Sequence, residues 1–202
     1  PFIALKTNRK AGIRAITLED GDHLINVIRT GGNDDILLAT AQGMAICFNE
    51  TDVRCMGRDA AGVRGISLNE GDYVVGAEKA EAGKTLLTVT ENGYGKRTEL
   101  PEYLRTGPDR EKIPQSRGGK GLKNYNITAK TGNVAGCRVV SDQDDVMLIE
   151  NGGVIIRVPA ASINVYKRDV QGVIVMRVDE GNKVVSLERV EQDAEENQES
   201  AQ

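Results

Sequence analysis

The sequence predicts an all-β fold, a propeller-like but incomplete ring built from four-stranded blades of about fifty residues each. Glycine-centred segments recur along the chain at a regular spacing, and short aliphatic runs of strand length lie between them. Aromatic residues make up only 3% of the composition, and Trp is absent. An aliphatic core, with 23 glycines for tight turns, suits a repeat-rich β protein better than a helical bundle.

The first repeat is a glycine followed by aliphatic and basic residues. The stretch 58–66, with Gly62 at its centre, returns around Gly12 and Gly172, and in a looser form around Gly121. The aligned glycines are 50, 59 and 51 residues apart. Because self-similarity at a nearly fixed period is the signature of repeat architectures, each copy predicts one structural module.

Two further glycine series keep step with the first and predict β-hairpins. In one series the glycine is followed by Asp or Asn, and in the other it closes a short polar stretch between two aliphatic runs. Both patterns are typical of tight turns between strands, so each copy predicts a hairpin. Each full module is therefore expected to have two hairpins and about four strands. The first of these series is Gly21, Gly71, Gly132 and Gly181, and the second is Gly43, Gly93 and Gly152.

The repeats divide residues 1–190 into a leading half module and three full ones. The half module is 1–34, and the full modules are about 35–84, 85–144 and 145–190. Because a closed ring needs at least about four blades, this arrangement predicts an open ring, or one that upstream residues complete.

Charge is distributed unevenly along the chain. The net charge is -4, but the segment 191–202 holds five acidic residues and no basic one, and it is predicted to be a disordered tail. Between Lys96 and Lys130 there are nine basic residues and four acidic ones. Within that segment, prolines and charges at 106–115 predict an exposed loop. The local electrostatic potential decides whether phosphate is attracted, so a polyanionic partner remains compatible with the negative net charge of the chain.

Several function classes are disfavoured. Cys47, Cys55 and Cys137 form no CxxC pair and there is a single histidine, His23, so no metal site is predicted. Reduced thiols fit a cytoplasmic location. No apolar run is long enough to span a membrane, so no membrane partner is expected. No nucleophile elbow, phosphate-binding loop or metal motif is present, so no catalysis and no cofactor are expected.

The glycine-rich segment 115–121 predicts an anion-binding loop. Gly118, Gly119 and Gly121 allow sharp turns that would expose backbone N–H groups, and such groups can form a concavity for an anion. Arg117 and Lys120 add positive charge, and a guanidinium can pair with phosphate through two hydrogen bonds. This is recognition of a nucleic-acid backbone, which carries no sequence information.

Basic residues recur at equivalent positions of the repeats, which predicts an arc of cations along one edge of the ring. Such an arc suits a curved duplex, so double-stranded DNA is the predicted partner. The alternative is that these side chains lie in solvated turns, or pair with Asp59 or Asp169. The predicted DNA-binding residues are Lys10, Arg14, Arg58, Arg64, Lys96, Arg97, Arg117, Lys120, Lys123 and Arg168.

Several segments carry a family resemblance. Residues 92–98 (Asn-Gly-Tyr-Gly-Lys-Arg-Thr), 62–66 and 171–175 resemble the C-terminal domain of the DNA gyrase A protein over nearly all of residues 1–190. The resemblance implies a β-pinwheel that bends DNA around a basic rim and supports negative supercoiling, with this chain as roughly its last four blades. It also implies that the rest of the gyrase A protein and the gyrase B protein are partners, and that ATP and Mg²⁺ act only in other parts of an enzyme whose DNA-cleaving tyrosine lies elsewhere.

One match to the family differs in sequence and place. The box-like loop Gln115, Arg117, Gly118, Gly119, Lys120 and Gly121 resembles the basic glycine-rich box of the family, but Ser116 stands where the family has a base. It also lies in a late module, whereas the family's functional box lies in the first blade. The loop is therefore interpreted as a copy of the repeat's own loop.

Three alternatives remain open. The equivalent domain of the topoisomerase IV A protein is also built from blades but wraps DNA less. A protein-interaction propeller would show apolar patches on one face of the disc. A propeller hydrolase would need polar residues that converge on the central channel. The acidic tail could also fold over the basic rim and compete with DNA.

Overall fold

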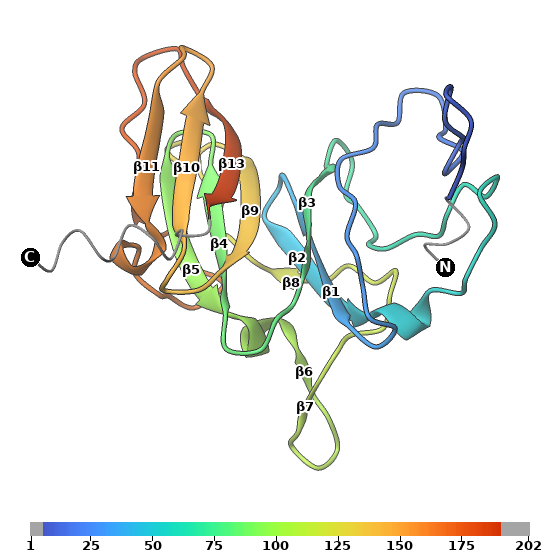
Figure 1. Ribbon diagram of the computed structural model, residues 1–202. Coiled ribbons are helices and arrows are strands. Elements are labelled where there is room, and N and C mark those ends of the chain that lie inside the picture. Colours follow the sequence, from blue (N-terminus) through green and yellow to red (C-terminus); the bar gives the residue numbers. More distant parts are fainter. Residues whose placement is uncertain (1–5, 191–202) are drawn as a thin grey trace, which may run out of the picture.

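The computed structural model describes residues 6–190, and within this range the chain folds into β-strands joined by loops and short 3-10 turns (Figure 1). The predicted all-β fold is confirmed, since no α-helix occurs among these residues. The long strands are β1 (Asp35–Thr40), β2 (Met44–Asn49), β3 (Val74–Lys79), β4 (Thr85–Thr90), β5 (Tyr94–Glu99), β9 (Val134–Val140), β10 (Asp145–Glu150), β11 (Ile155–Pro159) and β13 (Val184–Val190). The short strands are β6 (Arg105–Thr106), β7 (Lys112–Ile113), β8 (Leu122–Lys123) and β12 (Val173–Ile174), and the 3-10 turns are η2 (Glu50–Asp52), η3 (Leu100–Tyr103) and η4 (Ala160–Ser162).

Each blade is centred on one antiparallel hairpin. The strand orders are β3-β1-β2-β8, β9-β4-β5-β12 and β13-β10-β11. The hairpins β1–β2 and β4–β5 turn at Gly43 and Gly93, as the sequence predicts. The hairpin β10–β11 turns one residue later than predicted, because Gly153 has the positive φ of Gly43 and Gly93 and Gly152 does not. The third strand of each blade follows later in the same module and pairs with the first strand of the hairpin.

Within residues 6–190, the hairpins predicted at Gly21, Gly71, Gly132 and Gly181 do not form, as Gly71 shows. Gly71 does form a turn with φ +71°, and β3 begins soon after it, but the residues before that turn form no strand against β3. Instead, β3 pairs with β1, and the N–H of Ser67 donates to the carbonyl of Gly119 in the next module. The turn residues fix a local reversal of the chain, whereas the choice of strand partner depends on the aliphatic neighbour that buries more surface.

The fourth strand of a blade comes from the following module. β8 pairs with β2, and β12 pairs with β5, so the blades interlock. The glycine before each short strand allows this close approach: a Cβ on Gly121 would lie 2.3 Å from the carbonyl oxygen of Ala45. On the hairpin of the third blade, β11 has only β10 as a partner within residues 6–190.

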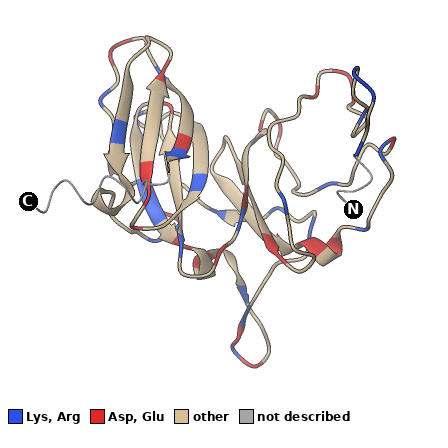
Figure 2. Ribbon diagram, in the orientation of Figure 1, with Lys and Arg blue, Asp and Glu red and all other residues tan. Residues whose placement is uncertain are grey.

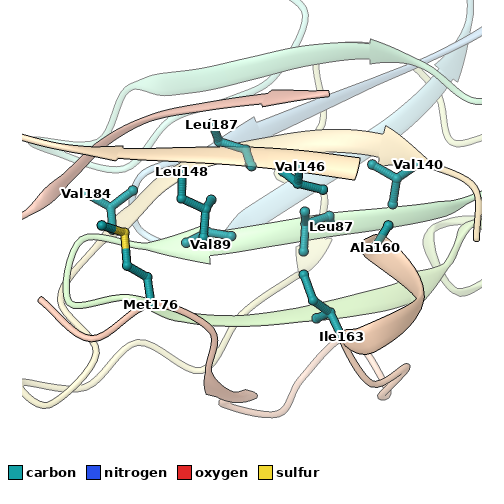
Figure 3. Close-up of a cluster of buried hydrophobic side chains, with 10 residues drawn as sticks. All are labelled: Leu87, Val89, Val140, Val146, Leu148, Ala160, Ile163, Met176, Val184 and Leu187. Carbon is teal, nitrogen blue, oxygen red and sulfur yellow. The ribbon is translucent and has the colours of Figure 1, made fainter. Parts of the chain in front are cut away.

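The core lies between neighbouring blades and is aliphatic, as the composition predicts. Side chains of β4, β10 and β13 converge on one cluster, and Ile163 and Met176 close it from the loops (Figure 3). Leu87 and Leu148 are fully buried there, and burial of such a side chain stabilises a fold by about 1.5–3 kcal/mol. An equivalent cluster with Leu37 and Leu86 joins the first blade to the second.

The part of the leading half module that the structure describes forms no regular strand. Leu24 to Arg29 is the counterpart of β3 by the alignment of Gly21 with Gly71, but no described hairpin lies beside it as β1 lies beside β3. Val27 is 76% exposed as a result. Glu50 holds the end of this segment, because its carboxylate accepts hydrogen bonds from Thr30, Gly32 and Asp34. The predicted acidic tail lies outside the described residues.

Candidate nucleic-acid interface

The basic repeat segments form a set of equivalent loops, here called the rim loops and defined as residues 8–16, 58–66, 117–125 and 168–176. Their aligned glycines Gly12, Gly62, Gly121 and Gly172 all have positive φ, at +71°, +91°, +74° and +76°. Residues with a Cβ rarely adopt this conformation, so glycine is required for the loop's shape.

Backbone hydrogen bonds join consecutive rim loops in the same way each time. The residue that directly follows each of the first three rim loops, five positions after the aligned glycine, donates its N–H to a carbonyl in the next loop. The donors and acceptors are Thr17 to Ala60 at 3.2 Å, Ser67 to Gly119 at 2.8 Å, and Asn126 to Val170 at 3.4 Å. These links place the rim loops next to one another in chain order.

An arginine repeats the same connection with its side chain. Nη1 of Arg58 donates to the carbonyl oxygen of Arg14 at 3.4 Å, that of Arg117 to Arg64 at 2.5 Å, and that of Arg168 to Lys123 at 2.9 Å. Every acceptor is the basic residue two positions after the aligned glycine of the preceding loop. Each link therefore brings two cationic residues from neighbouring loops together, and these residue pairs form an arc.

Most cations of the arc remain accessible to a ligand. The exposed residues are Lys10, Arg14, Arg58, Arg64, Lys120 and Lys123, whereas Arg117 and Arg168 are half-buried. The guanidinium group has five N–H donors, and the carbonyl links of Arg58 and Arg168 each use one of them. The predicted DNA-binding residues outside β5 therefore lie on one connected surface.

The box-like loop differs from its prediction in one respect. Its backbone N–H groups are not all exposed, because Gly118 donates to the carbonyl of Gly65 at 2.7 Å and Arg117 to a carboxylate oxygen of Asp52 at 3.3 Å. The loop is also anchored by Gln115, whose side chain donates to the carbonyl of Tyr103 at 2.9 Å. Glycine here serves close packing against β2, and the groups left for an anion are side chains such as Lys120.

The prediction that Lys96 and Arg97 contact DNA disagrees with their burial. Lys96 is 0% exposed, and its Nζ donates to the carbonyl oxygens of Lys167 and Arg168. Arg97 is 6% exposed and donates to the carbonyl of Ile163 and to the carboxylate of Asp142. The sequence does not reveal this burial, because β5 is covered by the loop that follows η4, which is distant from it along the chain.

The predicted exposed loop 106–115 contains part of a small hairpin, β6–β7, which projects from the body of the chain (Figure 1). Figure 2 shows basic and acidic residues side by side on it. At its base, Arg105 and Lys112 line an open hollow of about 490 Å³ together with Arg168. Sequence reasoning did not single out these two residues, although they belong to the basic segment that it identified.

A second charged feature lies on the inner strands, away from the rim loops. Arg138 on β9 pairs with Glu78 on β3 at 3.5 Å and with Glu188 on β13 at 2.8 Å, so one guanidinium links three blades. Burial raises the pKa of Glu78, and Arg138 opposes that rise. The charge of Arg138 is therefore used in joining blades.

Other classes of site find no support in the part of the chain that the structure describes. Its His, Cys, Asp and Glu residues form no group that could hold a metal ion. Among residues 6–190 there is also no helix with the length and apolar character needed to cross a membrane. Burial raises the pKa of Cys47 and of Cys137 to about 12 each, which is the behaviour of inert core thiols.

The chain is similar to known proteins along its whole described length. It matches the family model described as DNA gyrase C-terminal domain, beta-propeller, over residues 5–30, 34–81, 84–109, 112–141 and 144–191. The DNA gyrase A protein of Clostridium acetobutylicum is 44% identical over 197 residues, which are 98% of this chain but only 23% of that protein. The chain thus spans less than a quarter of the length of this relative.

Solved structures show the same architecture. The structure of the C-terminal domain of DNA topoisomerase IV superposes with a TM-score of 0.83 at 27% identity, covering 93% of this chain and 56% of that one. The structure of a DNA gyrase A C-terminal domain gives a TM-score of 0.76 at 29% identity, covering 89% of this chain and 58% of that one.

Proposed function

Because this chain belongs to the family of the DNA gyrase C-terminal domain, we propose that it binds double-stranded DNA along the rim loops and bends it. The observation that carries the proposal is the repeated arginine link. Arg58, Arg117 and Arg168 each place their cation beside the basic residue of the preceding loop. An arc with regularly spaced positive charge matches phosphates along a curved duplex.

The recognition would be independent of base sequence. The described residues include no helix that could enter the major groove, and the exposed groups of the rim loops are Arg and Lys side chains suited to phosphate. Sequence preference would then arise from how easily a DNA segment bends, because the bending energy depends on the base steps. Binding should weaken steeply with salt, since each phosphate contact releases condensed counterions.

The proposal extends to the whole enzyme. We place this chain in the gyrase A protein of a bacterial, cytoplasmic, ATP-dependent type IIA topoisomerase. There it would bend DNA next to the rest of the gyrase A protein and the gyrase B protein, and support negative supercoiling. The chain itself would carry out no bond cleavage. The identity of 44% to a DNA gyrase A protein supports this assignment.

The experiment is a salt titration of binding to a linear duplex of about 40 base pairs and to a DNA minicircle. The test variant carries Arg14→Gln, Arg64→Gln and Lys123→Gln together and so loses three positive charges. These residues accept the arginine links through their backbone carbonyls, which the substitutions keep. We expect the salt slope to fall by about 2–3 and affinity to drop on both DNAs.

A matched control removes the same charge elsewhere. The control variant also loses three positive charges, through Lys84→Gln, Arg157→Gln and Lys183→Gln. These residues lie outside the rim loops and form ion pairs with Glu81, Asp145 and Glu91, respectively. The control should bind DNA nearly as the parent chain does. The proposal fails if both triple variants lose the same affinity, or if the parent chain binds neither DNA at low salt.

A second candidate is the equivalent domain of the topoisomerase IV A protein, which the TM-score of 0.83 to a topoisomerase IV C-terminal domain favours. Both candidates predict salt-dependent binding, so the minicircle separates them. A gyrase-type domain should prefer the bent DNA strongly over the linear duplex, whereas the weaker wrapping expected for the second candidate should give a small preference.

A further inference from the structure

We propose that Lys96 is a positioning residue that braces two consecutive rim loops against each other from inside the fold and does not itself touch DNA. The bracing stands on contacts within the chain, and its consequence for DNA rests on the proposed function. Lys96 lies on β5, the second strand of the middle hairpin, and its side chain is fully buried.

The Lys96 amine contacts both loops directly. Its Nζ lies 2.6 Å from the carbonyl oxygen of Lys167 and 2.5 Å from that of Arg168, where the last rim loop begins. The same nitrogen lies 5.4 Å from the centre of the Tyr125 ring, at the end of the preceding rim loop. A cation over an aromatic face is attracted by the ring's charge distribution. One amine therefore fixes the separation of two loops.

The neighbouring blades show that packing alone does not require an amine here. The counterparts of Lys96 in the other two hairpins are Ile46 of β2 and Ile156 of β11. Each of these three residues directly follows the residue that forms the strand pair nearest the turn, which is Gly95, Ala45 or Ile155. Ile46 is 0% exposed and belongs to an apolar cluster. Burying an amine costs free energy unless its hydrogen bonds are made, so Lys96 is tolerated only while both carbonyls stay in place.

The first blade holds its rim loop by other means. There the loop at 117–125 is anchored by the backbone of Gln115, which donates to Cys47, and by Arg117, whose Nε donates to the carbonyl of Asp52 at 3.1 Å. The backbone anchor has its counterpart in the middle blade, where Tyr166 donates to Arg97 at 2.8 Å. The second anchor in the middle blade is the buried Lys96 amine, which donates a hydrogen bond to the carbonyl oxygen of Arg168.

The brace would act on DNA through Arg168. Lys96 fixes the carbonyl of Arg168, and Nη1 of Arg168 donates to the carbonyl of Lys123. The spacing between the cations of the last two rim loops therefore depends on a residue that no phosphate can reach. Loss of the brace should reduce the preference for bent DNA by loosening that spacing.

The first test needs no DNA. In Lys96→Met, an apolar side chain of similar length replaces the amine, as Ile46 does in the first blade. We expect tryptic cleavage after Lys167 and Arg168, located by mass spectrometry, to become about tenfold faster, and amides at 166–170 to exchange faster, while amides of β4 keep their protection. Tyr125→Phe keeps the ring and should leave both rates unchanged. Unchanged cleavage and exchange in a folded Lys96→Met variant would overturn the brace.

The second test is a double-mutant cycle on DNA affinity with Lys96→Met and Arg168→Gln. If Lys96 acts through Arg168, the double variant should bind as weakly as Arg168→Gln alone, and Lys96→Met alone should leave the salt slope nearly unchanged. Additive losses with a lower salt slope would mean that Lys96 meets phosphate, and would overturn the proposal. If the parent chain binds no DNA, the proposed function fails, and cleavage and exchange still decide the brace.

Discussion

Nη1 of Arg168 donates a hydrogen bond of 2.9 Å to the backbone carbonyl of Lys123, and the same relationship joins Arg117 to Arg64. These arginines therefore have a structural role as well as a charge. A substitution that removes the charge also removes the link between loops, so experiments must separate the two effects. Matched pairs of variants achieve this separation.

Arg117→Lys should destabilise the fold while keeping the charge. Arg117 donates from Nε to the carbonyl of Asp52 and from Nη1 to that of Arg64, and a lysine cannot reach both with the same planar geometry. We expect a loss of about 1–2 kcal/mol in the free energy of unfolding, measured in urea. Arg58→Lys is the control, since Arg58 makes a single link of 3.4 Å, and an equal loss there would contradict the prediction.

Gly172→Ala should be more costly than Gly181→Ala. Both glycines have positive φ, at +76° and +85°, so both substitutions strain the backbone by about 1–2 kcal/mol. Only at Gly172 would the new Cβ meet backbone, 2.4 Å from the carbonyl oxygen of Gly95, whereas Gly181 has open space. We expect a total loss of about 3–4 kcal/mol for Gly172→Ala by thermal or urea unfolding. Equal losses would show that β12 can move away from β5 at little cost.

Tyr103→Phe should destabilise the fold, whereas Tyr125→Phe should not. The hydroxyl of Tyr125 is buried and has no hydrogen-bond partner within residues 6–190, so its removal should leave stability unchanged or raise it by up to about 1 kcal/mol. The hydroxyl of Tyr103 donates to buried Asn124 at 2.5 Å, so its removal should cost about 1–2 kcal/mol. Chemical denaturation of both variants tests this, and a loss in Tyr125→Phe would point to an unseen partner.

Stability should rise with pH above neutrality because of Lys96. Burial lowers the pKa of Lys96 from 10.5 to about 7, with Asp169 and Glu102 opposing the change and Arg168 adding to it. Between these values the unfolded chain binds more protons than the folded chain at this site. The free energy of unfolding contributed by Lys96 therefore increases with pH, by at most about 1.4 kcal/mol per pH unit.

The measurement is the difference in unfolding free energy between the parent chain and Lys96→Met from pH 6.5 to pH 8.5, a range of about two units chosen to bracket the lowered pKa. Taking the difference cancels the titration of Cys47 and Cys137, whose raised pKa values lower stability at alkaline pH. The difference should shift in favour of the parent chain as pH rises. A flat difference would mean that Lys96 keeps an ordinary pKa.

The sequence predicted the β class, the repeat and the hairpins at Gly43 and Gly93 because turn chemistry and aliphatic runs are local signals. It did not predict that β8 would pair with β2, because that contact joins residues far apart in the chain and depends on how neighbouring modules sit. The hairpins predicted at the Gly71 series failed for the same reason: Gly71 specifies a turn, but the partner of β3 is set by tertiary packing.

The candidate site likewise has some features that the sequence predicts and others that it does not. The aligned bases at Arg58, Arg117 and Arg168 could be found from the repeat, because their spacing follows the glycines. The burial of Lys96 could not be found from the repeat, since a basic residue in a strand usually faces solvent and the groups that cover Lys96 come from loops distant in the sequence. A comparison with Ile46, the apolar residue at the same place in the first blade, is the signal that could have revealed it.

The pairing of β12 with β5 also determines where a mechanical load would go. Tension from a bent duplex that pulls on Arg168 enters the chain at the loop that continues into β12, and β12 is hydrogen-bonded to the sheet of the preceding blade. The force would therefore pass through the pairing of β12 with β5 into the sheet of the preceding blade. Each blade would carry part of the load applied to the next, so the ring would resist being pulled open one blade at a time.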